Sequence, residues 1–191
     1  PMTKNEFLEQ FHHMRVPHVE PDFPLKHTGR PAAVLIPLVD YGNKLSLLLT
    51  ERAHHLKHHP GQISFPGGAV EASDKTVIDA ALREAYEEIG LPSSNVETVG
   101  ILPPYRTISG YELVPVIGFV SPNCSPVIDK NEVESAFEVP RSHVLERKNH
   151  LVHTTHRNNQ SFPIYFIPWK ERMIWGATAA MLRNLSHHIH P

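Results

Sequence analysis

The sequence predicts an α/β protein built as an α/β/α sandwich. Apolar runs typical of strands recur between residues 32 and 169, and segments with helical periodicity stand before, between and after them. The chain has 191 residues, of which 40% are apolar and 20% are charged, as in a globular domain of ordinary size. We expect an N-terminal helix and an extended connector over residues 1–30, followed by a single domain over residues 31–191.

The first third of the chain predicts a helix, a connector and a hairpin. Thr3 and Glu6 have the spacing of a capping box and precede apolar residues at helical spacing. Four prolines between residues 16 and 31 indicate an extended connector. The hairpin has strands over residues 32–39 and 44–50, joined by a turn over residues 40–43.

Residues 62–91 predict a strand, a glycine turn at Gly67 and Gly68, a loop and an amphipathic helix. Six apolar residues recur at helical spacing and would line one buried stripe: Val77, Ile78, Ala81, Leu82, Ala85 and Ile89. The boundary signals of this helix are Ser73 or Asp74 as the N-cap, Gly90 at the end and Pro92 beyond it.

The rest of the chain mixes strands and helices. We expect strands over residues 96–102, 113–120, 132–139, 150–156 and 162–169, a loop over 103–112, a short helix over 140–147 and a C-terminal helix over 176–189. Residues 157–160 have a hairpin signature between the last two strands. Trp169 and Trp175 are expected to be packing residues.

The helix within residues 62–91 carries its acidic residues in an unfavourable place. Glu84 and Glu88 are four residues apart, so they are neighbours on one face and repel each other. Glu87 and Glu88 also lie at the negative end of the helix dipole. A divalent cation would remove this repulsion, because hard cations such as Mg²⁺ prefer carboxylate oxygens. A solvated acidic face is the alternative interpretation.

Net charge, hydropathy and cysteine content argue against several classes of protein. The formal net charge of −2 gives no indication of a general nucleic-acid or membrane-surface binder. No stretch approaches the roughly 20 apolar residues of a membrane span, and the N-terminus has no signal-peptide core. Cys124 is the single cysteine, which excludes an intrachain disulfide. We expect a cytoplasmic protein with no nucleic-acid or membrane partner.

Residues 83–91, REAYEEIGL, resemble the second half of the Nudix box, REUXEEXGU, in which U is aliphatic and X is any residue. In the first half, Asp74 lies six residues after Gly68 and nine before Arg83, where the usual box has a glutamate eight residues before the arginine. The resemblance places the box at about residues 67–91. It implies the Nudix fold, an α/β/α sandwich with a mixed sheet, and a hydrolase of nucleoside diphosphates linked to another group.

A second set of residues is similar to the signature of the coenzyme A pyrophosphatase branch of this family. It consists of LLTER at residues 48–52, LK at 56–57, HPGQ at 59–62 and FPGG at 65–68. That branch also has Asp at the position of Asp74, with the same extra residue. The resemblance implies hydrolysis of coenzyme A or acyl-coenzyme A to 3′,5′-ADP and 4′-phosphopantetheine or its acyl form.

The family resemblance also implies metal ligands. Glu84, Glu87 and Glu88 match the residues that bind Mg²⁺ or Mn²⁺, and the carbonyl of Gly67 would be a further ligand. Arg83 matches a residue that orients these glutamates. All five residues are thereby expected to belong to the catalytic centre.

The general base and the substrate-binding residues are less closely defined. Glu132, just before a predicted strand, is the candidate base, with Glu134 and Glu112 as alternatives. Four residues are expected to bind substrate: Arg52 and Lys57 in the basic loop over residues 51–61, Gly68 in the glycine turn, and Arg106 in the loop over 103–112.

Two other functions remain open. The chain could be a Nudix hydrolase for another substrate, such as ADP-ribose, NADH or a damaged nucleotide, because specificity depends on loops outside the acidic helix. It could also be a nucleotide-binding module without turnover, although such a module would be expected to have lost some of the three glutamates. Oligomeric state is not evident from the sequence, and a homodimer is suggested only by the habit of the family.

Overall fold

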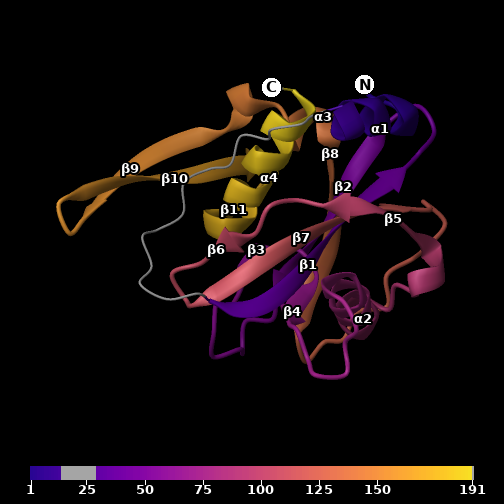
Figure 1. Ribbon diagram of the computed structural model, residues 1–191, viewed down its shortest axis with the longest axis horizontal. Coiled ribbons are helices and arrows are strands. Elements are labelled where there is room, and N and C mark those ends of the chain that lie inside the picture. Colours follow the sequence, from indigo (N-terminus) through magenta and orange to yellow (C-terminus); the bar gives the residue numbers. More distant parts are fainter. Residues whose placement is uncertain (14–28, 191) are drawn as a thin grey trace.

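The computed structural model describes residues 1–13 and 29–190, so most of the predicted connector over residues 16–31 lies outside the described residues. The described residues form an α/β/α sandwich and a smaller three-stranded sheet (Figure 1). The α-helices are α1 (Lys4–His13), α2 (Val77–Ile89), α3 (Arg141–Val144) and α4 (Gly176–Ile189). The strands are β1 (Arg30–Asp40), β2 (Leu45–Arg52), β3 (Ile63–Ser64), β4 (Gly67–Ala69), β5 (Val96–Ile101), β6 (Tyr105–Arg106), β7 (Tyr111–Val120), β8 (Val133–Pro140), β9 (Leu151–Arg157), β10 (Gln160–Trp169) and β11 (Arg172–Trp175).

The larger sheet is mixed, because β1 pairs in parallel with β7 and antiparallel with β2. β8 flanks β2 on one side of the sheet, and β5 flanks β7 on the other. β1 and β2 pair only near their turn, from Leu38 opposite Leu47 to Asp40 opposite Leu45. Beyond that point β4 pairs with β1 and β3 pairs with β2. The segment from β3 to β4 therefore lies inside the sheet, between the diverging β1 and β2.

Alternate side chains of β1 face two hydrophobic cores. Ile36 and Leu38 belong to the core that α1 and α4 cover, whereas Leu35 and Val39 belong to the core that α2 covers. Figure 1 shows α1 and α4 on one side of the sheet and α2 on the other. Burial on both faces explains why the sequence of this strand is a nearly continuous apolar run.

The smaller sheet consists of β9, β10 and β11. β9 and β10 form the predicted hairpin, with Arg157 opposite Gln160, and the hairpin reaches out from the body of the molecule (Figure 1). β11 was not predicted; it pairs with the end of β10 and leads directly into α4. This arrangement brings the C-terminal third of the chain back against the larger sheet, where Thr178 of α4 donates a hydrogen bond to the carbonyl of Ile63.

The predicted fold class and most of the predicted elements are confirmed. Thr3 and Glu6 form the predicted capping box, in which each backbone N–H donates to the other side chain. The C-terminal helix has the predicted bounds. The short helix predicted over residues 140–147 covers only Arg141–Val144, and the predicted loop over 103–112 contains the short strand β6. None of the described helices is long and apolar enough to span a membrane.

Two local predictions are wrong. Thr76 caps α2, in place of Ser73 or Asp74, because the Asp74 carboxylate accepts hydrogen bonds from Arg83 and from the backbone of Glu71. Gly67 and Gly68 lie in a strand, β4, because they pair with β1 instead of turning the chain.

Candidate active site

Helix α2 is held by caps at both ends. The Thr76 hydroxyl accepts a hydrogen bond from the N–H of Asp79, and Gly90 adopts the left-handed conformation that ends the helix as predicted. The loop after the helix continues this attachment, since the N–H groups of Val127 and Asp129 donate to the carbonyls of Ile89 and Glu88. These bonds fix the loop that carries the next acidic residue of the site, Glu132.

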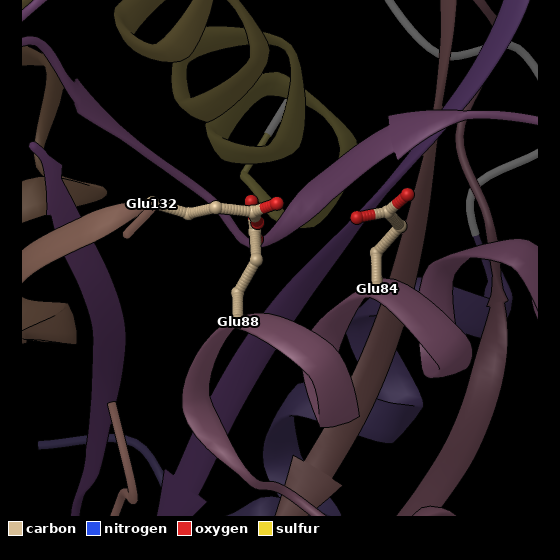
Figure 2. A group of neighbouring side chains, drawn as sticks. All are labelled: Glu84, Glu88 and Glu132. Atoms are coloured by element: carbon tan, nitrogen blue, oxygen red, sulfur yellow. The ribbon is translucent and has the colours of Figure 1, made fainter. Parts of the chain in front are cut away.

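Three carboxylates converge beside the β3–β4 segment. Oxygen atoms of Glu84, Glu88 and Glu132 all lie within 4.8 Å of one another. Figure 2 shows Glu84 and Glu88 rising from α2 and Glu132 reaching toward Glu88 from the neighbouring loop. The backbone of Glu132 is held on both sides: its N–H donates to Asp129, and its carbonyl accepts from the N–H of Ala53.

Glu88 is the most deeply buried member of the cluster, with 7% of its surface exposed. Its Oε2 accepts a hydrogen bond of 2.9 Å from the N–H of Gly67. The pKa of Glu88 is raised to about 8, mainly by burial and in part by the charges of Glu84 and Glu132, against the opposing effects of the Gly67 N–H and Arg52. Burial also raises the pKa of Glu84.

The two glycines of β4 lie against this cluster with no room for a side chain. A Cβ atom on Gly68 would lie 2.6 Å from Glu84 Oε1, and a Cβ on Gly67 would lie 2.4 Å from the carbonyl oxygen of Ala33. The carbonyl of Pro66 and the N–H of Val70 are hydrogen-bonded to β1. In an antiparallel pair, residues alternate between those bonded to the partner strand and those that are not, so the N–H and carbonyl of Gly67 point away from β1. The carbonyl of Gly67 is therefore free of the β1 ladder and faces the side where its N–H meets Glu88.

Arg83 connects the residues around the cluster. Its guanidinium donates a bidentate pair of 3.0 Å bonds to Asp74, one bond of 3.0 Å to Glu84 and one of 3.3 Å to Glu87. A further bond reaches the carbonyl of Ala69 at the end of β4. The hydrogen bonds from Arg83 lower the pKa of Asp74 and hold that carboxylate ionised. Arg83 thus orients Glu84 and ties α2 to the glycine strand.

The cluster has the chemistry of a site for a hard divalent cation. Three carboxylates from two segments offer oxygen ligands, and the raised pKa values of Glu84 and Glu88 reflect negative charge that burial leaves poorly compensated. Among the described residues, Glu84, Glu88 and Glu132 form the one such group of metal-ligating side chains. Glu84 and Glu88 would hold the ion, with Glu132 beside it and the Gly67 carbonyl on the same side of β4.

A cavity of about 790 Å³ adjoins the cluster, and β4 forms part of its wall. Gly67 and Gly68 line the cavity, as do Arg52 and residues of β10, β11 and α4. The Nε atom of Arg52 is buried and has no hydrogen-bond partner among the described residues, while its Nη2 donates to the carbonyl of His58. A buried cationic donor beside a cavity suits an anionic ligand such as a phosphate.

The predicted site residues fall into two groups. The structure brings together Arg83, Glu84, Glu88 and Glu132 around β4, with Gly67, Gly68 and Arg52 beside them. The others lie further out: Glu87 is exposed and contacts Arg83, Lys57 is exposed on its loop, and Arg106 lies between the cavity residues Tyr105 and Thr107 without lining the cavity itself. The alternative bases Glu112 and Glu134 are outside the carboxylate cluster.

Sequence reasoning missed the part of the cavity formed by the C-terminal third of the chain. Trp175, expected to be a packing residue, is 45% exposed and lines the cavity, whereas Trp169 packs against the core as expected. The only signal in the sequence was the presence of a tryptophan directly before a helix, and that signal does not identify a cavity.

Comparison with known proteins gives consistent matches. A family model described as the NUDIX domain matches residues 29–160. An "Uncharacterized Nudix hydrolase NudL" of Shigella flexneri is 39% identical over 188 residues, which make up 98% of this chain and 95% of that protein. A protein of the same name from Escherichia coli is 38% identical over 188 residues, again 98% of this chain and 95% of that protein. Among solved structures, the Nudix hydrolase RenU of M. Smegmatis aligns with 60% of this chain and 73% of its own, at 26% identity and a TM-score of 0.52.

Proposed function

Since the chain belongs to the Nudix hydrolase family, we propose that it hydrolyses the pyrophosphate bond of coenzyme A or acyl-coenzyme A, giving 3′,5′-ADP and 4′-phosphopantetheine or its acyl form. The observation that carries the hydrolytic part is the convergence of Glu84, Glu88 and Glu132 beside a cavity with a cationic wall. The similarity of residues 48–68 to the coenzyme A pyrophosphatase signature supports the choice of substrate.

The cofactor in this proposal is Mg²⁺ or Mn²⁺. Bound to the carboxylates, the ion would neutralise charge on the diphosphate and lower the pKa of a bound water. Glu84 and Glu88 converge from one face of α2, and Arg83 holds Glu84 in place through a bond of 3.0 Å. We assign Glu87 to the same ligand set as the family motif does, with Arg83 as its contact in this structure.

Glu132 is the proposed general base. It is exposed at the edge of the cluster, where water reaches it, and its loop is bonded to both α2 and the segment after β2. A carboxylate in this position can accept the proton of the attacking water and hold it until products leave. Arg52, with its unpartnered Nε, would bind a phosphate oxygen and keep the diphosphate beside the cluster.

A chromatographic product assay tests this proposal. The protein would be incubated with Mg²⁺ or Mn²⁺ and, separately, coenzyme A, acetyl-coenzyme A, ADP-ribose, NADH and Ap4A. Fastest formation of 3′,5′-ADP, abolished by a chelator, is the expected result. Faster cleavage of another substrate would refute the coenzyme A assignment and leave a Nudix hydrolase of different specificity. Nucleotide binding with no turnover of any substrate would refute catalysis.

A further inference from the structure

Strand β8 begins with a β-bulge next to the carboxylate cluster. In the antiparallel pairing of β8 with β2, Ser135 lies opposite Glu51. Val133 lies opposite Arg52, the next residue of β2, so Glu134 is an extra residue on β8. A bulge bends its strand and increases the local twist, and bulges are common beside active sites, where they change the direction of a side chain.

The bulge determines which residue lies opposite Glu132. The carbonyl of Glu132 accepts a hydrogen bond of 2.9 Å from the N–H of Ala53, the buried residue that follows β2. A regular ladder continued from the pair of Ser135 and Glu51 would instead place Glu132 opposite the exposed His54. A shift of one residue moves a strand by about 3.3 Å and turns each side chain to the other face of the sheet. The bulge therefore sets the side on which the Glu132 carboxylate lies.

Two neighbouring side chains stabilise this irregular backbone. Nζ of Lys130 donates a hydrogen bond of 2.9 Å to the carbonyl of Glu134, the residue that the bulge leaves out of the ladder. Oδ1 of Asp129 accepts a bond of 3.0 Å from the N–H of Asn131. The carbonyl of Asp129 also accepts bonds from the two N–H groups that follow Asn131. Residues 129–132, here called the base loop, are thus held by their own side chains and by the backbone of the first residue.

The side chain of Glu132 has no comparable anchor. Among the described residues, no hydrogen bond or ion pair to its carboxylate is present, although an oxygen of it lies within 4.8 Å of oxygens of Glu84 and Glu88. Figure 2 shows the side chain extended toward Glu88. The place of the carboxylate is therefore determined by the backbone of the base loop. A displacement of about 1 Å at a catalytic group can cost about a hundredfold in rate.

We propose that Asp129 and Lys130 are positioning residues for Glu132, because together they hold the turn and the bulge that direct its carboxylate to the attacking water. This inference rests on the proposed function, in which Glu132 is the general base. Neither Asp129 nor Lys130 lines the cavity, and neither belongs to the carboxylate cluster. Their effect on turnover is exerted through the backbone of Glu132.

The first experiment measures kcat and KM for Asp129→Ala and Lys130→Met with the substrate that the parent protein hydrolyses fastest. Each variant should reduce kcat about tenfold and leave KM within about twofold of the parent value, because the base is displaced while the substrate contacts remain. Asp129→Asn retains the acceptor and Lys130→Arg retains the donor, so both should recover most of the lost turnover. A parent-like kcat in Asp129→Ala or in Lys130→Met would remove that residue from the positioning role.

Two control variants lose the same chemical group elsewhere in the chain. Asp40 forms the same kind of turn between β1 and β2, where its Oδ1 accepts a bond of 2.9 Å from the N–H of Gly42. Lys148 is an exposed lysine outside the base loop. Asp40→Ala and Lys148→Met should leave kcat within about twofold of the parent value, even where Tm falls. An equal loss of kcat in the controls and in the base-loop variants would assign the effect to general destabilisation and contradict the inference.

The opposite charges of Asp129 and Lys130 separate position from electrostatics. An electrostatic influence on Glu132 would change kcat in opposite directions in Asp129→Ala and Lys130→Met, whereas loss of position lowers it in both. In the Glu132→Gln background, neither substitution should change kcat by more than about twofold, because the group that they position is already absent. A further tenfold loss in that background would show that the two residues act on another group and would overturn the inference.

Amide hydrogen exchange of the metal-free protein provides a test that does not depend on turnover. Asp129→Ala should increase the exchange rates of the Glu132 and Val133 N–H groups at least about tenfold, and Asp129→Asn should restore the parent rates. Unchanged exchange in Asp129→Ala would overturn the inference whatever the activity. Full activity of Glu132→Gln would refute the proposed base, whereas an inactive Glu132→Gln beside fully active Asp129→Ala and Lys130→Met would refute only the positioning role.

Discussion

At the scale of single residues, the buried carboxylate of Glu88 has opposite effects on stability and on metal binding. Without a cation, the buried carboxylate is unfavourable in its charged form, and its pKa is raised to about 8. In the proposed mechanism the same charge binds the metal ion. Glu132 has the opposite character, since its side chain is exposed while hydrogen bonds fix its backbone.

Glu88→Gln should lower kcat at least about a hundredfold, because the activating ion would be lost. In the presence of a chelator at pH 8.5, the same variant should have a Tm roughly 5 °C above that of the parent protein, because the buried charge is removed. The sign follows from the raised pKa: the stability associated with neutral Glu88 is lost as pH rises toward 8. Steady-state kinetics and scanning calorimetry provide the two readouts.

Asp79→Asn is the matched control, since Asp79 is an exposed acid in the first turn of the same helix. It should leave kcat within about twofold of the parent value. Turnover of Glu88→Gln close to that of the control would remove Glu88 from the metal site.

Glu132→Gln tests the proposed base. It should reduce kcat by about a hundredfold with little change in KM, as expected when a general base is removed. Glu134→Gln is the control, because Glu134 is also exposed and lies two residues after Glu132, near the start of β8. Its kcat should be close to that of the parent protein. Equal activity of the two variants in a steady-state assay would show that Glu132 is not the base.

At the scale of elements, the short strand β4 links the sheet, the acidic helix and the cavity. Its glycines are required for two different reasons. At Gly67 the nearest atoms belong to the backbone and side chain of β1, whereas at Gly68 they belong to the flexible end of Glu84. A methyl group at the first position meets atoms that cannot move, and at the second it meets a side chain that can.

Gly67→Ala should therefore destabilise the fold by several degrees in Tm, because its Cβ would lie 2.4 Å from the Ala33 carbonyl oxygen. Gly68→Ala should fold nearly normally but displace the Glu84 carboxylate, with metal affinity reduced about tenfold. Thermal unfolding and Mn²⁺ titration of both variants distinguish these outcomes. A Gly68→Ala protein with unchanged metal affinity would contradict the contact with Glu84.

At the scale of the whole molecule, His150 ties the short helix α3 to α4. Since a carbonyl only accepts and a guanidinium only donates, its Nε2 donates to the Val144 carbonyl and its Nδ1 accepts from Arg183. Burial is the main cause that lowers the pKa of His150, and the neighbouring charge of Arg183 contributes. The folded protein thus favours the neutral ring.

Stability should consequently fall as pH drops below about 6.5, where the unfolded chain takes up a proton that the folded chain resists. His150→Gln, which retains an amide donor, should flatten this part of the pH profile of unfolding free energy. His153→Gln, on the exposed strand β9, should leave the profile unchanged. Parallel profiles of the parent and His150→Gln in urea titrations would refute the assignment.

The sequence could predict the features that are encoded in short stretches, but not those that depend on contacts between distant segments. Periodicity identified α2 and α4, and the acidic motif identified Glu84 and Glu88, because these signals are contained in short stretches. Glu132 remained one of three candidates, since its approach to Glu88 depends on a loop bonded to the end of α2. Gly67 and Gly68 were expected to form a turn. They form a strand because they pair with β1, and this long-range pairing is not evident from the sequence.

The cavity was beyond sequence reasoning for a related reason. Its walls come from β1, the segment after β2, the β10–β11 pair and α4, which meet only in the folded chain. Periodicity shows which face of an element is buried, but it does not show which elements adjoin. Trp175 was therefore expected to pack, although its indole lies at the rim of the cavity.

The most direct measurement is a calorimetric titration of Mn²⁺ into the parent protein and into Glu88→Gln, with kcat determined on the same samples. If Glu84 and Glu88 hold the metal ion, the parent should bind Mn²⁺ and the variant should lose both most of that affinity and at least about 99% of its turnover. Unchanged Mn²⁺ affinity with near-normal turnover in Glu88→Gln would contradict the assignment of the catalytic centre to this cluster.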